Sequence, residues 1–222
     1  MDLLYFLFGS CLGSWICASA YRYNLPELKN EKRSICPQCH QKLPFYDLIP
    51  IISWFYLKGK CRFCHHEIPF DHLVCEVLCG LLMVFCMHQD NPLLICCLAY
   101  VLIYAAYTDI YHGLIPDRCH VMMFLIYVLS EPAEWEMQML YFFIVLCVLY
   151  LVAYMSQGLG YGDVKLIASM SLFISLYKLL WVICIASTSA LIFNLSKRKK
   201  DKIRFAPYLG FSCFVVLLFS TL

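Results

Sequence analysis

The feature that most constrains this sequence is a series of eight apolar stretches separated by short polar turns. A helix that crosses the hydrocarbon core of a bilayer needs about 20 apolar residues. Spanning helices would therefore take up most of the chain, apart from one long polar section. The pattern predicts an all-α integral membrane protein with about eight transmembrane helices and one polar loop between the first two.

Composition agrees with this interpretation, because 62% of the 222 residues are hydrophobic and only 14% are charged. With a mean hydropathy of +0.72, the chain lies well outside the range of soluble domains. We expect a first helix over residues 1–21, a loop domain over 22–71 and a polytopic core over 72–222. The spans are predicted at residues 3–21, 72–89, 93–108, 118–130, 137–156, 163–176, 179–196 and 205–222.

The first stretch is predicted to be an uncleaved anchor. It has an aspartate before it and an arginine after it, whereas a secretory signal begins with basic residues and ends at a small-residue cleavage site. Small residues repeat at intervals of four along one face, in the pairs Gly9/Gly13 and Ser10/Ser14. Such a face suits close helix packing; a chance run of small residues in a membrane helix is the alternative.

The polar section contains two C-x2-C pairs separated by 21 residues, formed by Cys36, Cys39, Cys61 and Cys64. Each pair supplies two thiolates from a tight turn, which is typical of a structural zinc site. Two disulfides or unliganded thiols are the alternatives, and disulfides are disfavoured if the loop faces the reducing cytosol. Three neighbouring histidines are potential substitute ligands, but four thiols suffice: His40, His65 and His66.

The distribution of basic residues predicts the orientation, since lysine and arginine concentrate in cytoplasmic loops. With eight spans, 16 of the 17 Lys and Arg residues fall on one side, in the long loop, the turns after the third and fifth spans, and residues 197–204. We expect that side to be the cytoplasm and both termini to lie outside it.

Two carboxylates stand at the ends of apolar stretches on this predicted cytoplasmic side. Asp109 ends the third stretch and Asp163 begins the sixth, 54 residues later. Ionisable groups in such places are functional candidates. Two neighbouring carboxylates share a proton and can activate water, which is aspartic peptidase chemistry. The glycines within residues 158–162 would let an extended chain approach Asp163 closely.

Structural explanations exist for the same residues. Asp163 is also a plausible helix N-cap or a carrier of ions or protons, and Asp117, which follows a proline, is expected to be an N-cap. Lys165 is expected to pair with a carboxylate or a lipid phosphate. The Gly-x-Gly-x-Gly sequence from residue 158 is not a dinucleotide fingerprint, because no strand precedes it and its spacing differs.

Nearly the whole chain resembles the type IV prepilin peptidases, a family of bacterial membrane enzymes. The motifs that carry the resemblance are FGS at 8–10, YR at 21–22, the Cys pairs around 46–54, Asp109 with IPD at 115–117, and GYGDVKL at 160–166. The resemblance implies that Asp109 and Asp163 are the catalytic pair. It also implies a location in the bacterial inner membrane, with the active site at the cytoplasmic face.

Members of this family remove a basic leader from prepilins or pseudopilins. Many then methylate the new N-terminus with S-adenosylmethionine. The resemblance therefore implies prepilin substrates and, where methylation is retained, that cofactor. Surrounding lipid is the other expected partner, and no nucleic acid is expected.

The resemblance also marks Glu76, and we expect Glu76, Gly160, Gly162 and Lys165 to contact substrate or cofactor. An interhelical hydrogen bond is the alternative for Glu76. Two positions depart from the family pattern: Tyr111 stands where a second aspartate is frequent, and Gly13 where asparagine is common. The second departure weakens the transfer of methyltransferase activity to this chain.

Two other functions compete with a prepilin peptidase. A presenilin-like intramembrane aspartic protease shares a Gly-x-Gly-Asp sequence, but aspartates at span edges and a Cys-rich loop argue against it. A non-enzymatic zinc-bearing scaffold or ion transporter would use the two aspartates to carry protons or cations. Retained transport without cleavage after Asp→Asn changes would favour that function.

Overall fold

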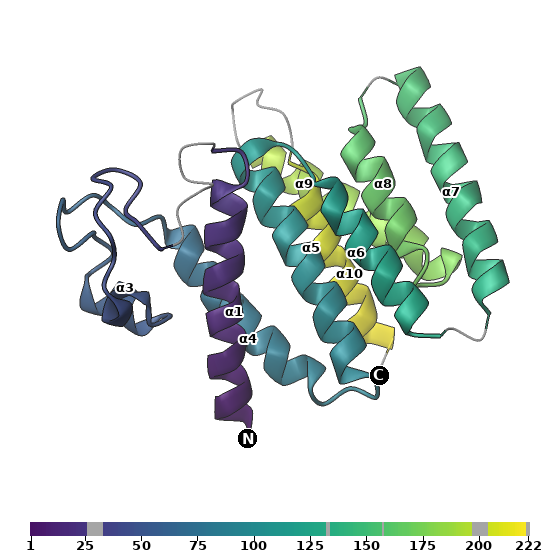
Figure 1. The fold of residues 1–222 in the computed structure, drawn as a ribbon. Helices are drawn as coiled ribbons and strands as arrows, with labels where there is room; N and C mark the ends of the chain where they lie inside the picture. Colours follow the sequence, from purple (N-terminus) through teal and green to yellow (C-terminus); the bar gives the residue numbers. More distant parts are fainter. Residues whose placement is uncertain (26–32, 132–133, 157, 197–203, 221–222) are drawn as a thin grey trace. The chain divides into compact units, whose positions relative to one another are not determined.

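A computed structural model describes residues 1–25, 33–131, 134–156, 158–196 and 204–220 (Figure 1). The regular secondary structure of the described residues is helical, apart from two isolated bridges that pair Ile35 with Lys42 and Lys60 with Glu67. Its helices are α1 Asp2–Arg22, η1 Phe45–Leu48, α3 Ile52–Tyr56, α4 Phe70–Cys86, α5 Pro92–His112, α6 Asp117–Leu129, α7 Trp135–Ser156, α8 Tyr161–Met170, α9 Leu176–Ser196 and α10 Ala206–Ser220.

All eight predicted apolar helices are present, with most ends within a few residues of the expected positions. The largest difference is at α8, which ends at Met170 instead of residue 176. The hydroxyl of Ser171 donates to the Ala168 carbonyl at 2.7 Å. Serine side chains that bond to nearby backbone in this way compete with helix continuation. The short helices η1 and α3 inside the polar loop were not predicted.

The chain divides into two compact units, Met1–Cys96 and Cys97–Leu222, and α5 begins in the first and continues in the second. This division is coarser than the three segments expected from the sequence, and the expected boundary near residue 71 stays a prediction.

In the first unit α1 and α4 pack antiparallel through small residues. A Cβ built on Gly13 would lie 2.8 Å from the Cys75 carbonyl oxygen, and one on Gly9 would lie 2.6 Å from that of Cys79. Only glycine lets two helix backbones approach this closely. The predicted small-residue face of the first helix is therefore a packing surface, and chance composition does not explain it.

The second unit has one apolar core to which all of its described helices contribute. Its most deeply buried members come from α8, α9 and α10, including Leu166, Leu179 and Leu209. Ala105 of α5 and Met123 of α6 also belong to it. The ends of α5 and α8 are thus held by a common core, and these two ends carry the candidate aspartates.

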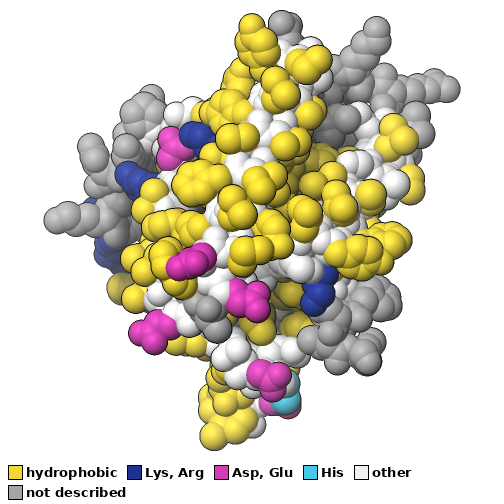
Figure 2. Space-filling model, turned by 90° about the vertical axis from the view of Figure 1, so that its right-hand side faces the viewer, with side chains coloured by type: hydrophobic (Ala, Val, Ile, Leu, Met, Phe, Trp, Pro, Cys, Tyr) yellow, Lys and Arg dark blue, Asp and Glu magenta, His cyan; other side chains and the backbone are white. Residues whose placement is uncertain are grey.

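The chain is a membrane protein. Among the described residues four helices are long and apolar enough to cross a bilayer: α1, α5, α7 and α9. Only 6% of the most apolar stretch of α7 is buried, and hydrophobic side chains are the most abundant kind on the face that carries α7 (Figure 2). Such a surface matches a hydrocarbon environment. The remaining apolar helices are shorter, so the expected count of eight spans stays a prediction.

Candidate functional site: a carboxylate pair and a four-cysteine centre

Asp109 lies in the last turn of α5 and is 7% exposed. Its Oδ2 accepts a hydrogen bond from the backbone N–H of Ala206 at 3.2 Å, at the first residue of α10. Its carbonyl oxygen accepts a hydrogen bond from Nη1 of Arg204 at 2.9 Å. The start of α10 therefore fixes the position of this carboxylate.

Asp163 lies in the first turn of α8, a helix outside the four long apolar ones, and is partly buried. The N-cap of α8 is Gly160, and no side chain caps it, so the N-cap interpretation of Asp163 is wrong. A Cβ on Gly160 would lie 2.9 Å from Oδ2 of Asp163. Gly160 therefore leaves room for the carboxylate to fold back over the helix start.

The two segments that carry the aspartates meet in the second unit. A Cβ on Gly162 would lie 3.4 Å from Cβ of Ile115 in the α5–α6 turn. Beside this contact Nζ of Lys165 donates to Oδ1 of Asp117 at 2.7 Å. The predicted pairing of Lys165 with a carboxylate is confirmed. Asp117 is the first residue of α6 and Pro116 is its N-cap, so the N-cap prediction for Asp117 is wrong.

Asp109 and Asp163 are close enough for the negative charge of one carboxylate to act on the other. Asp109 is buried and Asp163 partly buried. Burial and a nearby like charge both disfavour ionisation of a carboxylate. The arrangement can therefore hold one protonated and one ionised acid.

The second candidate site is the cysteine cluster in the first unit. The sulfur atoms of Cys36, Cys39, Cys61 and Cys64 all lie within 4.8 Å of one another. The Sγ atoms of Cys36 and Cys64 are 3.8 Å apart, and all four cysteines are free thiols. Four sulfurs at the vertices of a tetrahedron, each about 2.3 Å from zinc, would be about 3.8 Å apart. The cluster thus has the dimensions of a metal site.

The two halves of the cluster have the same local geometry. In each half, the backbone N–H of the residue after the second cysteine donates a hydrogen bond to the carbonyl oxygen of the first cysteine. The distance is 2.9 Å for His40 and 3.0 Å for His65. Both histidines have positive φ, 56° and 55°. Burial raises the pKa of Cys61, but hydrogen bonds from the backbone N–H groups of Cys64 and Phe63 and from the thiols of Cys36 and Cys64 outweigh it and lower the pKa to about 7. Burial raises the pKa of Cys36. The N–H groups stabilise the thiolate form of Cys61, which is the form that binds a metal.

Glu76 is buried in α4, where its Oε2 accepts the backbone N–H of Ile51 at 2.6 Å. Its side chain therefore holds the polar loop against the helix. Glu76 belongs to the first unit and the two aspartates to the second. Contact of Glu76, Gly160, Gly162 or Lys165 with substrate or cofactor stays a prediction.

Sequence reasoning missed the residues that position the sites. Arg204 and Ala206 hold Asp109, and Arg62 binds both carboxylate oxygens of buried Asp47, at 2.6 and 2.8 Å. The only signals in the sequence were an arginine directly before the last apolar stretch and another inside the second C-x2-C turn.

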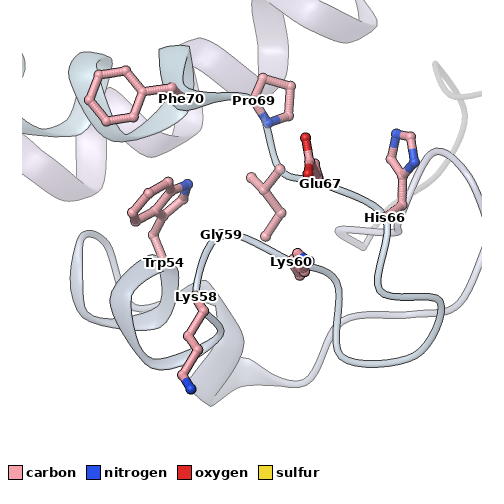
Figure 3. A pocket seen from close by; sticks show the side chains of 9 residues that line it. Trp54, Lys58, Gly59, Lys60, His66, Glu67, Pro69 and Phe70 are labelled. Carbon is pink, nitrogen blue, oxygen red and sulfur yellow. The ribbon is translucent and has the colours of Figure 1, made fainter.

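A pocket of about 540 Å³ lies next to the second C-x2-C turn (Figure 3). Trp54 and Phe70 form its aromatic side, with ring centroids 5.8 Å apart, and Gly59 forms its floor against the indole. Lys60, Glu67 and His66 complete the rim (Figure 3). Charges of both signs line this open hollow, which does not by itself define a ligand.

The chain is thus a polytopic membrane protein with a paired-carboxylate site in one unit and a four-cysteine centre in the other. It belongs to the type IV leader peptidase family: the model of that family matches residues 96–195, and the bacterial peptidase A24 N-terminal domain matches residues 7–89. The two matched regions correspond to the two compact units. The resemblance read from the motifs is therefore confirmed.

Three relatives illustrate the similarity. The prepilin leader peptidase/N-methyltransferase of Aeromonas salmonicida is 28% identical over 219 residues, which cover 90% of this chain and 74% of the relative. The protein of the same name from Bacillus subtilis is 33% identical over 175 residues, covering 73% and 69%. The type 4 prepilin-like proteins leader peptide-processing enzyme of Escherichia coli is 29% identical over 194 residues, covering 80% and 72%. No solved structure shows a significant match to the chain.

Proposed function

We propose that this chain is an aspartic endopeptidase that removes the basic leader from type IV prepilins or pseudopilins, with Asp109 and Asp163 as its catalytic residues. The observation that carries this proposal is the meeting of the two aspartate segments in one core, joined by the Lys165–Asp117 ion pair. The names of the relatives supply the substrate class.

The chemistry follows from two neighbouring carboxyl groups that share a proton. The ionised carboxylate removes a proton from water, and the resulting hydroxide attacks the carbonyl carbon of the scissile peptide bond. The protonated partner donates its proton to the carbonyl oxygen. As the tetrahedral intermediate collapses, the first carboxyl group gives the proton it took from water to the leaving amine, and a hydroxyl of the intermediate returns a proton to the second carboxylate, so both groups regain their starting states. The N–H of Ala206 and the guanidinium of Arg204 keep Asp109 in place for this exchange.

The topology proposed for this reaction has eight spans with the aspartates at the cytoplasmic face and both termini outside. It is supported by the count of basic residues, 16 of which fall on the side of the aspartates. Six of these basic residues lie in the loop before α10, where residues 197–203 are outside the described part of the chain.

The four-cysteine centre is proposed to hold a structural zinc ion. Its fit rests on the sulfur spacing and on backbone N–H groups directed at the thiolates. Zinc there would fold the loop, and four thiolate ligands would leave it no open coordination position for a catalytic water.

A second activity, N-methylation of the cleaved product with S-adenosylmethionine, is proposed from the names of the relatives. No contact described above assigns residues to that cofactor. The close packing of Gly13 against α4 leaves no room for the asparagine that is common in the family at that position.

The competing functions are less well supported. A presenilin-like protease does not account for the match to the peptidase A24 N-terminal domain. A scaffold or transporter does not account for the match to the leader peptidase family, because the matched residues 96–195 include both aspartates.

The test is mass spectrometry of a prepilin co-expressed with the wild type, Asp109→Asn or Asp163→Asn. We expect leader loss with the wild type, an intact precursor with both variants, and an additional methyl group on the product if the second activity is present. Asp90→Asn, an exposed aspartate outside the site, is the matched control and should process normally. Normal processing by either site variant would remove that residue from the mechanism.

A further inference from the structure

The polar loop of the first unit carries an unusually apolar surface between its two cysteine pairs. Six large apolar side chains within residues 45–56 are between 45% and 77% exposed: Phe45, Tyr46, Ile49, Ile52, Phe55 and Tyr56. They belong to η1, α3 and the turn between them, and we call this stretch the 45–56 segment. Exposed aromatic and aliphatic residues in such a density mark an interaction surface.

The 45–56 segment reverses direction at Ile51, which has a φ of 65°. The N–H of Ile52 donates to the Pro50 carbonyl at 2.6 Å across this residue, which makes Ile51 the centre of a strained γ-turn. A β-branched residue adopts such a conformation only when its surroundings impose it. Here the N–H of Ile51 is held by the carboxylate of Glu76 in α4.

This anchor fixes how deep the turn lies along the helix pair. Glu76 is six residues past the start of α4 at Phe70, and its carboxylate also accepts a hydrogen bond from Ser14, eight residues before the end of α1 at Arg22. At 1.5 Å per residue these separations are about 9 and 12 Å. The headgroup zone of one leaflet is only about 5–8 Å thick. If the loop-side ends of α1 and α4 lie at the water boundary of the headgroup zone, the Ile51 turn reaches the edge of the hydrocarbon core.

The backbone of the 45–56 segment suits this depth because several of its polar groups are bonded within the loop. Ser53 donates to the Ile49 carbonyl at 3.0 Å, Phe55 to that of Ile51 at 3.2 Å, and Leu57 to that of Ser53 at 2.9 Å. Non-helical backbone is tolerated near lipid only when it is bonded within the protein.

Cationic side chains surround the apolar surface. The guanidinium of Arg62 lies 5.0 Å from the ring centroid of Tyr46 and 5.8 Å from that of Tyr56, and Arg33 lies 5.0 Å from that of Phe45. The one carboxylate within the segment, Asp47, is buried and paired with Arg62. Aromatic residues flanked by cations are typical of surfaces that face anionic headgroups.

We propose that the 45–56 segment is a re-entrant interfacial element, whose exposed apolar side chains insert among the lipids of the leaflet that α1 and α4 enter from the loop side. Its tip is anchored by Glu76, which also accepts a hydrogen bond from Ser14. Arg33, beside Phe45, faces the phosphate groups, while Arg62 neutralises the one carboxylate of the segment. The cysteine-bearing loop is then a domain seated in the membrane surface on one side, while its cysteine turns stay in water.

The test is photo-crosslinking of the full chain in vesicles of phosphatidylethanolamine and phosphatidylglycerol. p-Benzoylphenylalanine replaces Phe55 or, in a second variant, Tyr56. Phe193 of the spanning helix α9, which is 60% exposed, is the lipid-facing control. Gln38, exposed in the first cysteine turn, is the water-facing control.

We expect lipid adducts at positions 55 and 56 with a yield close to that at position 193 and roughly tenfold above that at position 38, since acyl chains lie within reach only of membrane-inserted side chains. Crosslinks to peptides of the same chain or of a second copy would show that protein covers the surface, and would overturn the proposal. Absence of lipid adducts at both positions, with normal reaction at 193, would overturn it as well.

Discussion

Replacement of Gly13 by alanine tests the packing of α1 on α4 with a single carbon atom. The added Cβ would lie 2.7 Å from Cβ of Cys79 and 2.8 Å from the carbonyl oxygen of Cys75. Carbon atoms in contact prefer separations of about 3.5–4.0 Å, and both neighbours belong to or adjoin the α4 backbone, so neither can rotate away. The helices must therefore move apart by about 1 Å.

Overpacking of this kind costs about 1–3 kcal/mol, while alanine in place of glycine within a helix returns about 0.5–1 kcal/mol. Gly210 in α10 provides the matched control, because a Cβ there would meet no described atom within 4 Å. Gly210→Ala keeps only the favourable effect. The two variants are expected to differ by about 1–3 kcal/mol, with Gly13→Ala the less stable.

The assay is thermal unfolding of both variants and the wild type in one detergent, at one protein concentration. For a chain of this size the expected difference corresponds to about 2–12 °C in Tm. Equal Tm values for the two variants would refute the close approach of α1 and α4. A stabilised Gly13→Ala variant would do so more strongly, because helix propensity would then be the only effect present.

Three further predictions concern the two sites. Purified protein is expected to contain one zinc ion per chain by elemental analysis. Cys61→Ser should lose this ion, whereas Cys147→Ser, which changes an exposed cysteine outside the cluster, should keep it. Zinc retained by Cys61→Ser would contradict the four-thiolate assignment. Lys165→Gln should lower the cleavage rate about tenfold to a hundredfold, because the start of α8 would be misplaced. The double variant Lys165→Asp with Asp117→Lys reverses both charges and should recover part of the cleavage rate. If the rate does not recover, Lys165 acts in some way other than through its pair with Asp117. Asp163→Asn should unfold at a higher temperature than the wild type at neutral pH, because the amide removes the like-charge repulsion between two poorly solvated carboxylates. An unchanged or lower Tm would contradict the pairing of Asp109 with Asp163.

The parts of the fold that follow from local sequence could be predicted. Each long apolar stretch became a helix, since a run of apolar residues between polar turns leaves the backbone few alternatives. The cysteine cluster followed from spacing alone, because a C-x2-C turn places two sulfurs on one side of the chain. Asp109 and Asp163 were selected as candidates because an ionisable residue at the mouth of an apolar membrane segment is costly unless it serves a function.

The contacts that position these residues could not be predicted. Arg204 reaches Asp109 across 95 residues of sequence, and Ile51 reaches Glu76 across 25. No periodicity encodes such contacts, which depend on how helices pack. Asp117 illustrates the limit: a proline before an aspartate is typical of a helix start, yet tertiary contact with Lys165 determined the role of its side chain.

The four-cysteine centre also encloses a stretch of chain. Between Cys39 and Cys61 lie 21 residues, and these include η1, α3 and the whole apolar surface of the loop. An ion bound to both ends would act like a covalent cross-link. By the loop-closure relation it would lower the conformational entropy of the unfolded loop by an amount equivalent to about 3 kcal/mol of stabilisation. The geometry of the membrane-facing turn is thus set from both sides, by a carboxylate within the helix pair and by a cross-link in water. Removal of the metal would therefore weaken the contact between the 45–56 segment and lipid, although this contact lies away from the sulfur atoms.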